Sequence, residues 1–167
     1  MKRKYVVAVA VIIVTVTAIW AFSFHRKRLP TIPFPNDPRA QTGLSIVPVA
    51  LPDGTRIAAE VAGTFSQVSR GLMYRDVVPP LTGMLMVYSD EQYRQIWMKN
   101  VKVDLDVVFI GENKQITHIA KNLKKSPEHI SDEDVSRVTG YGKYVLELAA
   151  GEADRLKLKK GMQLVFL

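Results

Sequence analysis

The stretch Ile96–Ile110, IWMKNVKVDLDVVFI, combines chemically distinct side chains with a long apolar run and is the centre of the folded part of this chain. It begins with an indole, a thioether, an ammonium and a carboxamide side by side, at Trp97, Met98, Lys99 and Asn100. It ends in an uninterrupted apolar run over residues 107–110, which is typical of a buried β-strand. We therefore predict a strand here that carries chemistry as well as packing.

The N-terminal segment 1–28 has a different character. Tyr5–Phe24 is free of charge and rich in Val, Ile and Ala, and as a helix it would be about 30 Å long, enough to span a bilayer. The apolar run is longer than that of a cleaved signal peptide, so we predict an uncleaved transmembrane helix. Basic flanks at 2–4 and 26–28 are nearly balanced and leave the orientation open. With only four residues before the span, we expect the domain to face the periplasm or cell exterior.

The basic charge of the chain belongs to these flanks. The formal net charge is +7, but residues 29–167 hold 17 basic and 16 acidic side chains, a net of +1. The flanks suit anionic lipid head groups, and the near-neutral remainder argues against nucleic-acid binding. The chain has no cysteine, which excludes disulfides and thiolate chemistry.

The remainder divides into a linker and one domain. Residues 29–42 contain four prolines and predict an extended spacer, and a domain is expected over residues 43–167. The fold class predicted is α+β, predominantly β, with a compact barrel-like antiparallel or mixed sheet and a few short helices. Besides the central stretch, strands are predicted at Leu44–Leu51, Thr55–Val61, Leu81–Tyr88, Gln115–Ala120, Lys143–Ala150 and Gln163–Leu167. Short helices are predicted at Thr64–Arg70, with Thr64 as N-cap, and from Ser131.

Four short motifs occur in order along the domain: RGLMYR at 70–75, GMLM at 83–86, WMKN at 97–100 and YVLEL at 144–148. Together they resemble the family known as domain of unknown function 192. The resemblance covers about residues 44–167 and implies a compact β-rich fold, with no established activity. Members of that family often carry an N-terminal export signal or anchor. Where the family has Thr after WMKN this chain has Val101, and Asp104 replaces Pro before the LD pair. Ile96 replaces the Phe that precedes the Trp in the family, and Gly161-Met162 replaces a Gly-Asp pair near the end of the domain.

The motifs supply the candidate ligand-binding residues. Arg70, Arg75 and Lys99 would form a basic pocket for a carboxylate or phosphate, with Asn100 orienting the ligand. The pocket would be walled by Met73, Trp97 and Met98, while Asp106 and Glu147 positioned the cations. The alternative is that these arginines pair with buried acids in a structural network.

Two other functions stay open at this stage. Paired carboxylates among Asp104, Asp106 and Glu147 would indicate a hydrolase of an envelope polymer, provided that two of them face one cleft. Convergence of at least three sulfurs of Met73, Met84, Met86 and Met98 would indicate copper handling, since thioethers suit Cu(I). His118 and His129 do not form a zinc motif, so no metal site is expected among them.

The favoured interpretation is a membrane-anchored binding or accessory module. No nucleophile elbow or triad stands out, so catalysis is the less favoured role. No bound cofactor is expected, and the expected partners are the membrane and either a small anionic ligand or an envelope protein.

Overall fold

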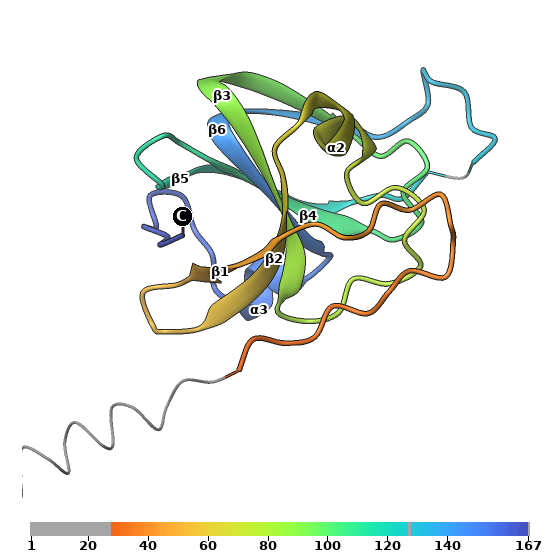
Figure 1. Ribbon diagram of the computed structural model, residues 1–167. Helices are drawn as coiled ribbons and strands as arrows, with labels where there is room; N and C mark the ends of the chain where they lie inside the picture. The colour runs from red at the N-terminus through yellow and green to blue at the C-terminus, as the bar shows by residue number, and fades with distance from the viewer. Residues whose placement is uncertain (1–27, 127, 167) are drawn as a thin grey trace, which may run out of the picture.

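The computed structural model describes residues 28–126 and 128–166, and its centre is a six-stranded mixed sheet of order β1-β2-β3-β6-β4-β5 (Figure 1). Only β2 and β3 are parallel; every other neighbouring pair is antiparallel. The predicted β-rich, mixed character is confirmed. The strands are β1 (Ile46–Ala50), β2 (Arg56–Ala62), β3 (Thr82–Trp97), β4 (Leu105–Ile110), β5 (Ile116–Leu123) and β6 (Arg137–Ala149).

The apolar run of the central stretch is explained by β4, which is buried at all of its positions. Side chains alternate across a strand, and here both faces of the sheet are covered. Val108 and Ile110 join one hydrophobic cluster, together with residues of the C-terminal segment. Val107 and Phe109 join a second cluster, on the face covered by the loop that follows residue 70.

The prediction of one strand over Ile96–Ile110 is wrong, because the stretch belongs to two strands. Trp97 is the last residue of β3, and β4 begins only at Leu105. Both strands are antiparallel to β6 and lie on its two sides, so residues 98–104 must cross from one side to the other. The crossing begins with a turn in which the Val101 N–H donates to the Met98 carbonyl at 3.1 Å and Asn100 adopts a φ of 56°.

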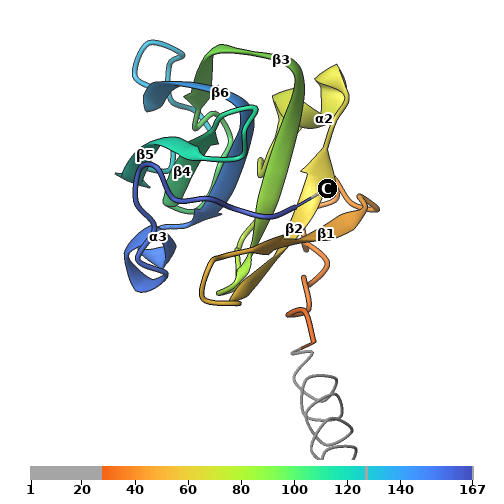
Figure 2. The ribbon, with the colours of Figure 1, turned by 90° about the vertical axis from the view of Figure 1, so that its left-hand side faces the viewer.

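The strands do not form a closed barrel. Among the described residues, β1 and β5 are the outer strands, and the C-terminal segment connects them by isolated bridges, Ala50 to Val165 and Gln115 to Gln163. Figure 2 shows this segment running from α3 past β5 toward β1. Within its described part, the strand predicted at Gln163–Leu167 is reduced to two bridging residues, Gln163 and Val165.

The helices are short and lie at opposite ends of the sheet (Figure 1): α2 (Phe65–Arg70) and α3 (Glu152–Arg155). The first was predicted, and Thr64 is its N-cap. The helix predicted from Ser131 is wrong, because the chain makes a turn there, closed by the Asp134 N–H on the Ser131 carbonyl, and enters β6 at Arg137. The second helix, α3, directly follows β6 and was not predicted.

The predicted membrane span, Tyr5–Phe24, lies outside the described residues. Within residues 28–126 and 128–166, no helix has the length and apolar character needed to cross a bilayer.

Candidate functional site

A pocket of about 210 Å³ lies between the end of α2, β3 and β6, where all four sequence motifs meet. The first motif contributes residues 70–73, the second Met86, the third Trp97 and the fourth Glu147. We call it the motif pocket. Its remaining lining comes from Val68, Ser69, Tyr88, Gln95, Ile96 and Val101.

The end of α2 forms one wall of this pocket for reasons that are local in the sequence. Thr64 and Gln67 form a capping box, which fixes the start of the helix. The helix ends at Gly71, whose φ of 49° disfavours any residue with a Cβ. A Cβ on Gly71 would lie 3.0 Å from Met86 Cε and 3.5 Å from Glu147 Oε2. Glycine at this position therefore lets the chain pass directly over the Glu147 carboxyl group.

Glu147 is the buried polar group of the motif pocket, with only 3% of the residue exposed. The Leu72 N–H donates to its carboxyl group, but Oε2 has no hydrogen-bond partner in the described part of the chain. Burial raises the pKa of Glu147 to about 7, and the hydrogen bond from Leu72 opposes that rise. Near neutral pH this carboxyl group can therefore lose or gain a proton, and one of its oxygens has room for a partner.

The other walls combine apolar and aromatic side chains with the polar Ser69 and Gln95. Met73 and Met86 contribute thioethers, and Trp97 lies at the surface with 40% of the residue exposed. The Tyr88 hydroxyl lies 3.8 Å from Met86 Sδ, and burial, with a contribution from the charge of Glu147, raises the pKa of Tyr88. The pocket thus combines apolar walls, a few polar groups and a single buried acid, an arrangement suited to binding a small organic molecule.

Four of the nine predicted site residues line the motif pocket: Arg70, Met73, Trp97 and Glu147. The structure does not gather the predicted cations into one place. Arg75 is 4% exposed and forms a two-point ion pair with Glu60, at 2.7 and 3.0 Å, and Lys99 pairs with Asp132. Arg70 alone reaches the pocket.

The other predicted residues have structural contacts. Met98 is fully buried in the hydrophobic cluster behind the pocket. The Asn100 carbonyl accepts the Tyr74 N–H at 2.8 Å, which ties the crossing segment to the loop after α2. Asp106 is fully buried, and its two oxygens accept the N–H groups of Asn122 and Ala153 at 2.9 and 2.8 Å.

The three acids named for a hydrolase do not share a cleft. Glu147 is paired in register with Val107, so Asp106 points to the opposite face of the sheet. Asp104 lies outside β4, where Lys124 pairs with it at 2.8 Å and the Lys125 N–H donates to it. The sheet therefore separates Glu147 from Asp106, and Asp104 lies just before the start of β4.

The four methionines of the copper hypothesis all contribute to one hydrophobic cluster. Met84, Met86 and Met98 are buried members of it, and Met73 packs against it. Met84 Sδ accepts the Gln41 Nε2 amide at 3.5 Å. Within the described residues, no group of three or more His, Asp or Glu side chains is arranged to hold a metal ion.

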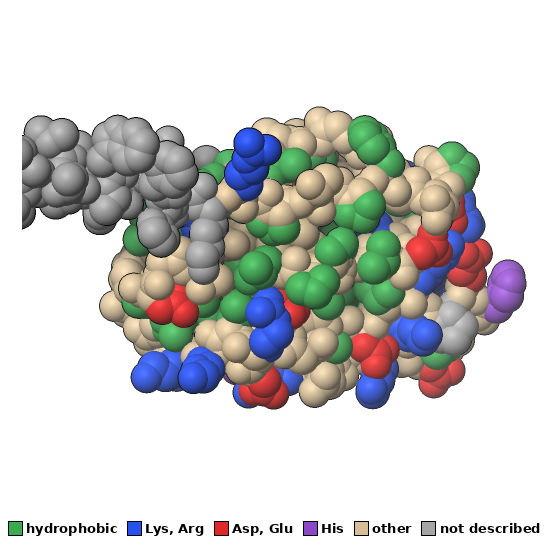
Figure 3. All heavy atoms as spheres, turned by 90° about the horizontal axis from the view of Figure 1, so that it is seen from below, with side chains coloured by type: hydrophobic (Ala, Val, Ile, Leu, Met, Phe, Trp, Pro, Cys, Tyr) green, Lys and Arg blue, Asp and Glu red, His purple; other side chains and the backbone are tan. Residues whose placement is uncertain are grey.

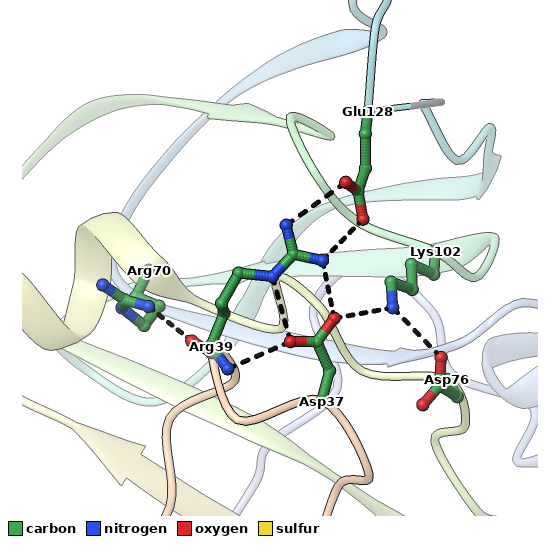
Figure 4. A network of polar contacts seen from close by, with 6 residues as sticks. All are labelled: Asp37, Arg39, Arg70, Asp76, Lys102 and Glu128. Atoms are coloured by element: carbon green, nitrogen blue, oxygen red, sulfur yellow. Dashed lines mark hydrogen bonds and ion pairs between the residues drawn. The ribbon is translucent and has the colours of Figure 1, made fainter.

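Part of the predicted linker packs against the domain beside the motif pocket. We call residues 37–41 the strap. The Asp37 carboxylate accepts from Arg39 at 2.8 Å and from Lys102 at 2.9 Å. The Arg39 guanidinium also pairs with Glu128, and the Arg39 carbonyl accepts a hydrogen bond from Arg70 (Figure 4). Arg39, and then Lys102, hold the pKa of Asp37 far below its usual range. Through the Arg39 carbonyl, the strap fixes the Arg70 side chain at the rim of the motif pocket.

Four residues that line the motif pocket were not predicted as site residues from the sequence: Gly71, Leu72, Met86 and Tyr88. Gly71 and Leu72 were noted only as members of the first motif, and Met86 only in the second motif and the copper hypothesis. The usable signal was proximity, because Gly71 and Leu72 lie within the first motif and Met86 ends the second.

Comparison with known proteins agrees with the fold. The family model DUF192, described as "Uncharacterized ACR", matches residues 49–166. A crystal structure from Sinorhizobium meliloti, described as a "putative transcription regulator", is 30% identical with a TM-score of 0.64, covering 75% of this chain and 97% of its own. A protein of unknown function from Novosphingobium aromaticivorans is 27% identical with a TM-score of 0.61, covering 81% of this chain and 93% of its own. No curated protein matches.

Proposed function

The chain belongs to the DUF192 family, and we propose that its domain is a binding module for a small organic ligand that carries one hydrogen-bond donor. The donor, an amine or a hydroxyl, would meet Glu147 Oε2, and the apolar body of the ligand would lie among Met73, Met86 and Trp97.

The unpartnered oxygen of Glu147 carries this proposal. A buried polar atom without a hydrogen bond typically costs about 1–3 kcal/mol, and native proteins retain few of them. A ligand donor placed at Oε2 would remove that cost. An amine would add the attraction between an ammonium group and the carboxylate, which lowers the pKa of Glu147 on binding.

The size of the pocket sets the size of the ligand. A volume of about 210 Å³ equals about seven water molecules at ~30 Å³ each, below the range of drug-sized sites. A benzylamine- or phenol-sized molecule fits this space. Arg70 at the rim is the remaining cation of the predicted basic pocket, and it would accommodate an anionic substituent that extends out of the pocket.

Binding is better supported than catalysis because the motif pocket has one carboxyl group and no second acid in its described lining. Nucleic-acid binding also has little support in this chain, in spite of the name given to the Sinorhizobium meliloti protein. Residues 29–167 have a net charge of +1, and Figure 3 shows basic and acidic side chains interspersed on the face seen from below.

We also propose that Tyr5–Phe24 anchors the domain to a membrane, with the domain facing the periplasm or cell exterior. The support is the uncharged apolar stretch and its basic flanks. Full-length protein should sediment with membranes and resist extraction by high salt and alkaline carbonate, whereas a version beginning at Leu29 should be released. Sedimentation of both versions alike would contradict the anchor.

The binding proposal is tested by thermal melting of the full chain with phenol, benzylamine and toluene. Ligand that binds only the native state stabilises it by about 2.7 kcal/mol at 100 times its dissociation constant. Phenol and benzylamine should raise the melting temperature more than toluene, which has the same ring and no donor. In Glu147→Gln the advantage of benzylamine over toluene should fall sharply, because the amide carries no charge. Equal shifts with benzylamine and toluene in the wild type, or no shift with any ligand, would refute the proposal.

A further inference from the structure

A second hollow, which shares no residue with the motif pocket, lies where the outer parts of β3 and β6 approach the turn between β4 and β5. Its volume is about 940 Å³, at the upper end of the range of ligand sites. The C-terminal segment contributes Lys160 and Gly161 to its edge. We call this hollow the tyrosine groove.

Tyr93 and Tyr141 give the tyrosine groove an aromatic wall. They are register partners on β3 and β6, and their rings pack edge to face with centroids 5.2 Å apart and an interplanar angle of 69°. They are 74% and 42% exposed, so the pair presents aromatic surface to solvent. The Thr117 hydroxyl donates to the Tyr141 carbonyl and holds that strand against the start of β5. The aromatic surface is therefore exposed and supported by fixed backbone.

The rest of the lining is rich in neutral hydrogen-bonding groups. Asn113, Gln115, Thr117 and Thr139 supply amides and hydroxyls, which both donate and accept. Asn113 is ordered by the Gln115 N–H, which donates to its Oδ1 at 3.0 Å. Both amide residues lie on the β4–β5 side, across the hollow from the tyrosines on β3 and β6.

The charged groups of the groove largely compensate one another. Glu91 Oε1 accepts the Glu112 N–H at 3.1 Å, and the Glu112 carboxylate pairs with Lys143. Lys160 adds a positive charge to the edge of the groove. With charges of both signs at its edge, the groove has no strong preference for an ion of either sign.

We propose that the tyrosine groove binds a neutral oligosaccharide, with one sugar ring against Tyr93 and Tyr141. A sugar ring has an apolar C–H face that packs on an aromatic surface and hydroxyl groups around its edge that both donate and accept. The groove offers the matching pattern, with aromatic rings and the Thr139 hydroxyl on the β3–β6 side and the amides of Asn113 and Gln115 on the β4–β5 side. The volume of the tyrosine groove accommodates several sugar units, whereas the motif pocket is too small to hold an oligosaccharide.

The test is calorimetric titration of the full chain with three uncharged six-unit oligosaccharides: a β-glucan, an α-glucan and an N-acetylglucosamine oligomer. At least one should bind with a dissociation constant below about 1 mM. Tyr93→Ala and Tyr141→Ala should each weaken that binding about tenfold, equivalent to the loss of ~1.4 kcal/mol of ring contact. Tyr93→Phe, which keeps the ring, should bind nearly as the wild type does.

Two further variants make the result specific to this groove. Thr139 is exposed, so Thr139→Arg should fold normally and block the groove with a long side chain. Trp97→Ala alters the motif pocket and should leave oligosaccharide binding unchanged, so failure of this inference and failure of the proposed function are distinguishable. The inference is overturned if none of the three oligosaccharides binds at about 10 mM, or if both tyrosine-to-alanine variants bind as tightly as the wild type.

Discussion

Replacing Glu147 by glutamine should change the way in which the stability of this protein depends on pH. Most buried carboxylates are paired, so their pKa falls on folding and they stabilise the native state as pH rises. Glu147 should behave in the opposite way, because burial without a charged partner raises its pKa from 4.5 to about 7.

This rise in the pKa of Glu147 makes the stability of the protein depend on pH. Between the two pKa values the native state binds more protons at this site than the unfolded state does, so the free energy of unfolding falls as pH rises. The stabilising contribution is complete below pH 4.5 and is lost as pH passes the folded-state value near 7. At 1.36 kcal/mol per pKa unit, the full loss is ~3 kcal/mol, a large fraction of the stability of an ordinary domain.

The assay is urea denaturation of the full chain at a series of values between about pH 5 and pH 8.5, where paired carboxylates stay ionised. The wild type should lose ~3 kcal/mol more over that interval than Glu147→Gln, whose side chain does not titrate. Glu152→Gln is the matched control. Glu152 is also buried, but Arg155 lowers its pKa, so its removal should shift the whole curve by a constant amount.

Parallel curves for the wild type and Glu147→Gln over this interval would contradict this prediction. Parallel curves would mean that the Glu147 carboxyl group is solvated or paired, and the unpartnered oxygen that supports ligand binding would then be absent.

Three further changes test the framework around the site. Asp106→Ala should cost about 1–3 kcal/mol in urea denaturation, because it leaves the buried Ala153 N–H without its acceptor and also removes the bond to the partly buried Asn122 N–H. Arg75→Met should cost about 3–5 kcal/mol, because it leaves Glu60 charged and buried, and the double variant Arg75→Met with Glu60→Leu should recover most of that loss. Gly83→Ala should lower the melting temperature markedly, because its Cβ would overlap the Glu147 carbonyl oxygen; overpacking of this kind costs about 1–3 kcal/mol or more.

Each of these has an outcome that would contradict it. A wild-type melting curve for Gly83→Ala would mean that β3 and β6 are not in the register described. A double variant no more stable than Arg75→Met alone would show that Arg75 does more than compensate Glu60. Asp106→Asn, which keeps one acceptor, should fall between the wild type and Asp106→Ala, and equal losses would contradict a role in hydrogen bonding.

The features that depend on a few neighbouring residues could be predicted from the amino-acid order alone. Thr64 and Gln67 form a capping box within one helical turn, and Gly71 ends the helix because it accepts a positive φ. The apolar run at 107–110 indicated a buried strand, since a strand covered on both faces needs apolar residues at successive positions. The four motifs also identified the family.

Which of the motif residues share a site depends on contacts between segments that are far apart in the chain. Lys99 and Arg75 were expected to bind a ligand, but they are paired with Asp132 and Glu60, which lie 33 and 15 residues away in the sequence. Trp97 and Glu147 meet at one pocket because β3 lies beside β6, while the period-two alternation of β4 directs Asp106 to the other face. Local hydrogen bonding and periodicity act within a few residues, whereas strand order and register fix the partner of each charged side chain. The amino-acid order shows which charged side chains a protein has, whereas pairing between distant segments determines which of them are satisfied internally and which, like Glu147 Oε2, have no partner among the described residues.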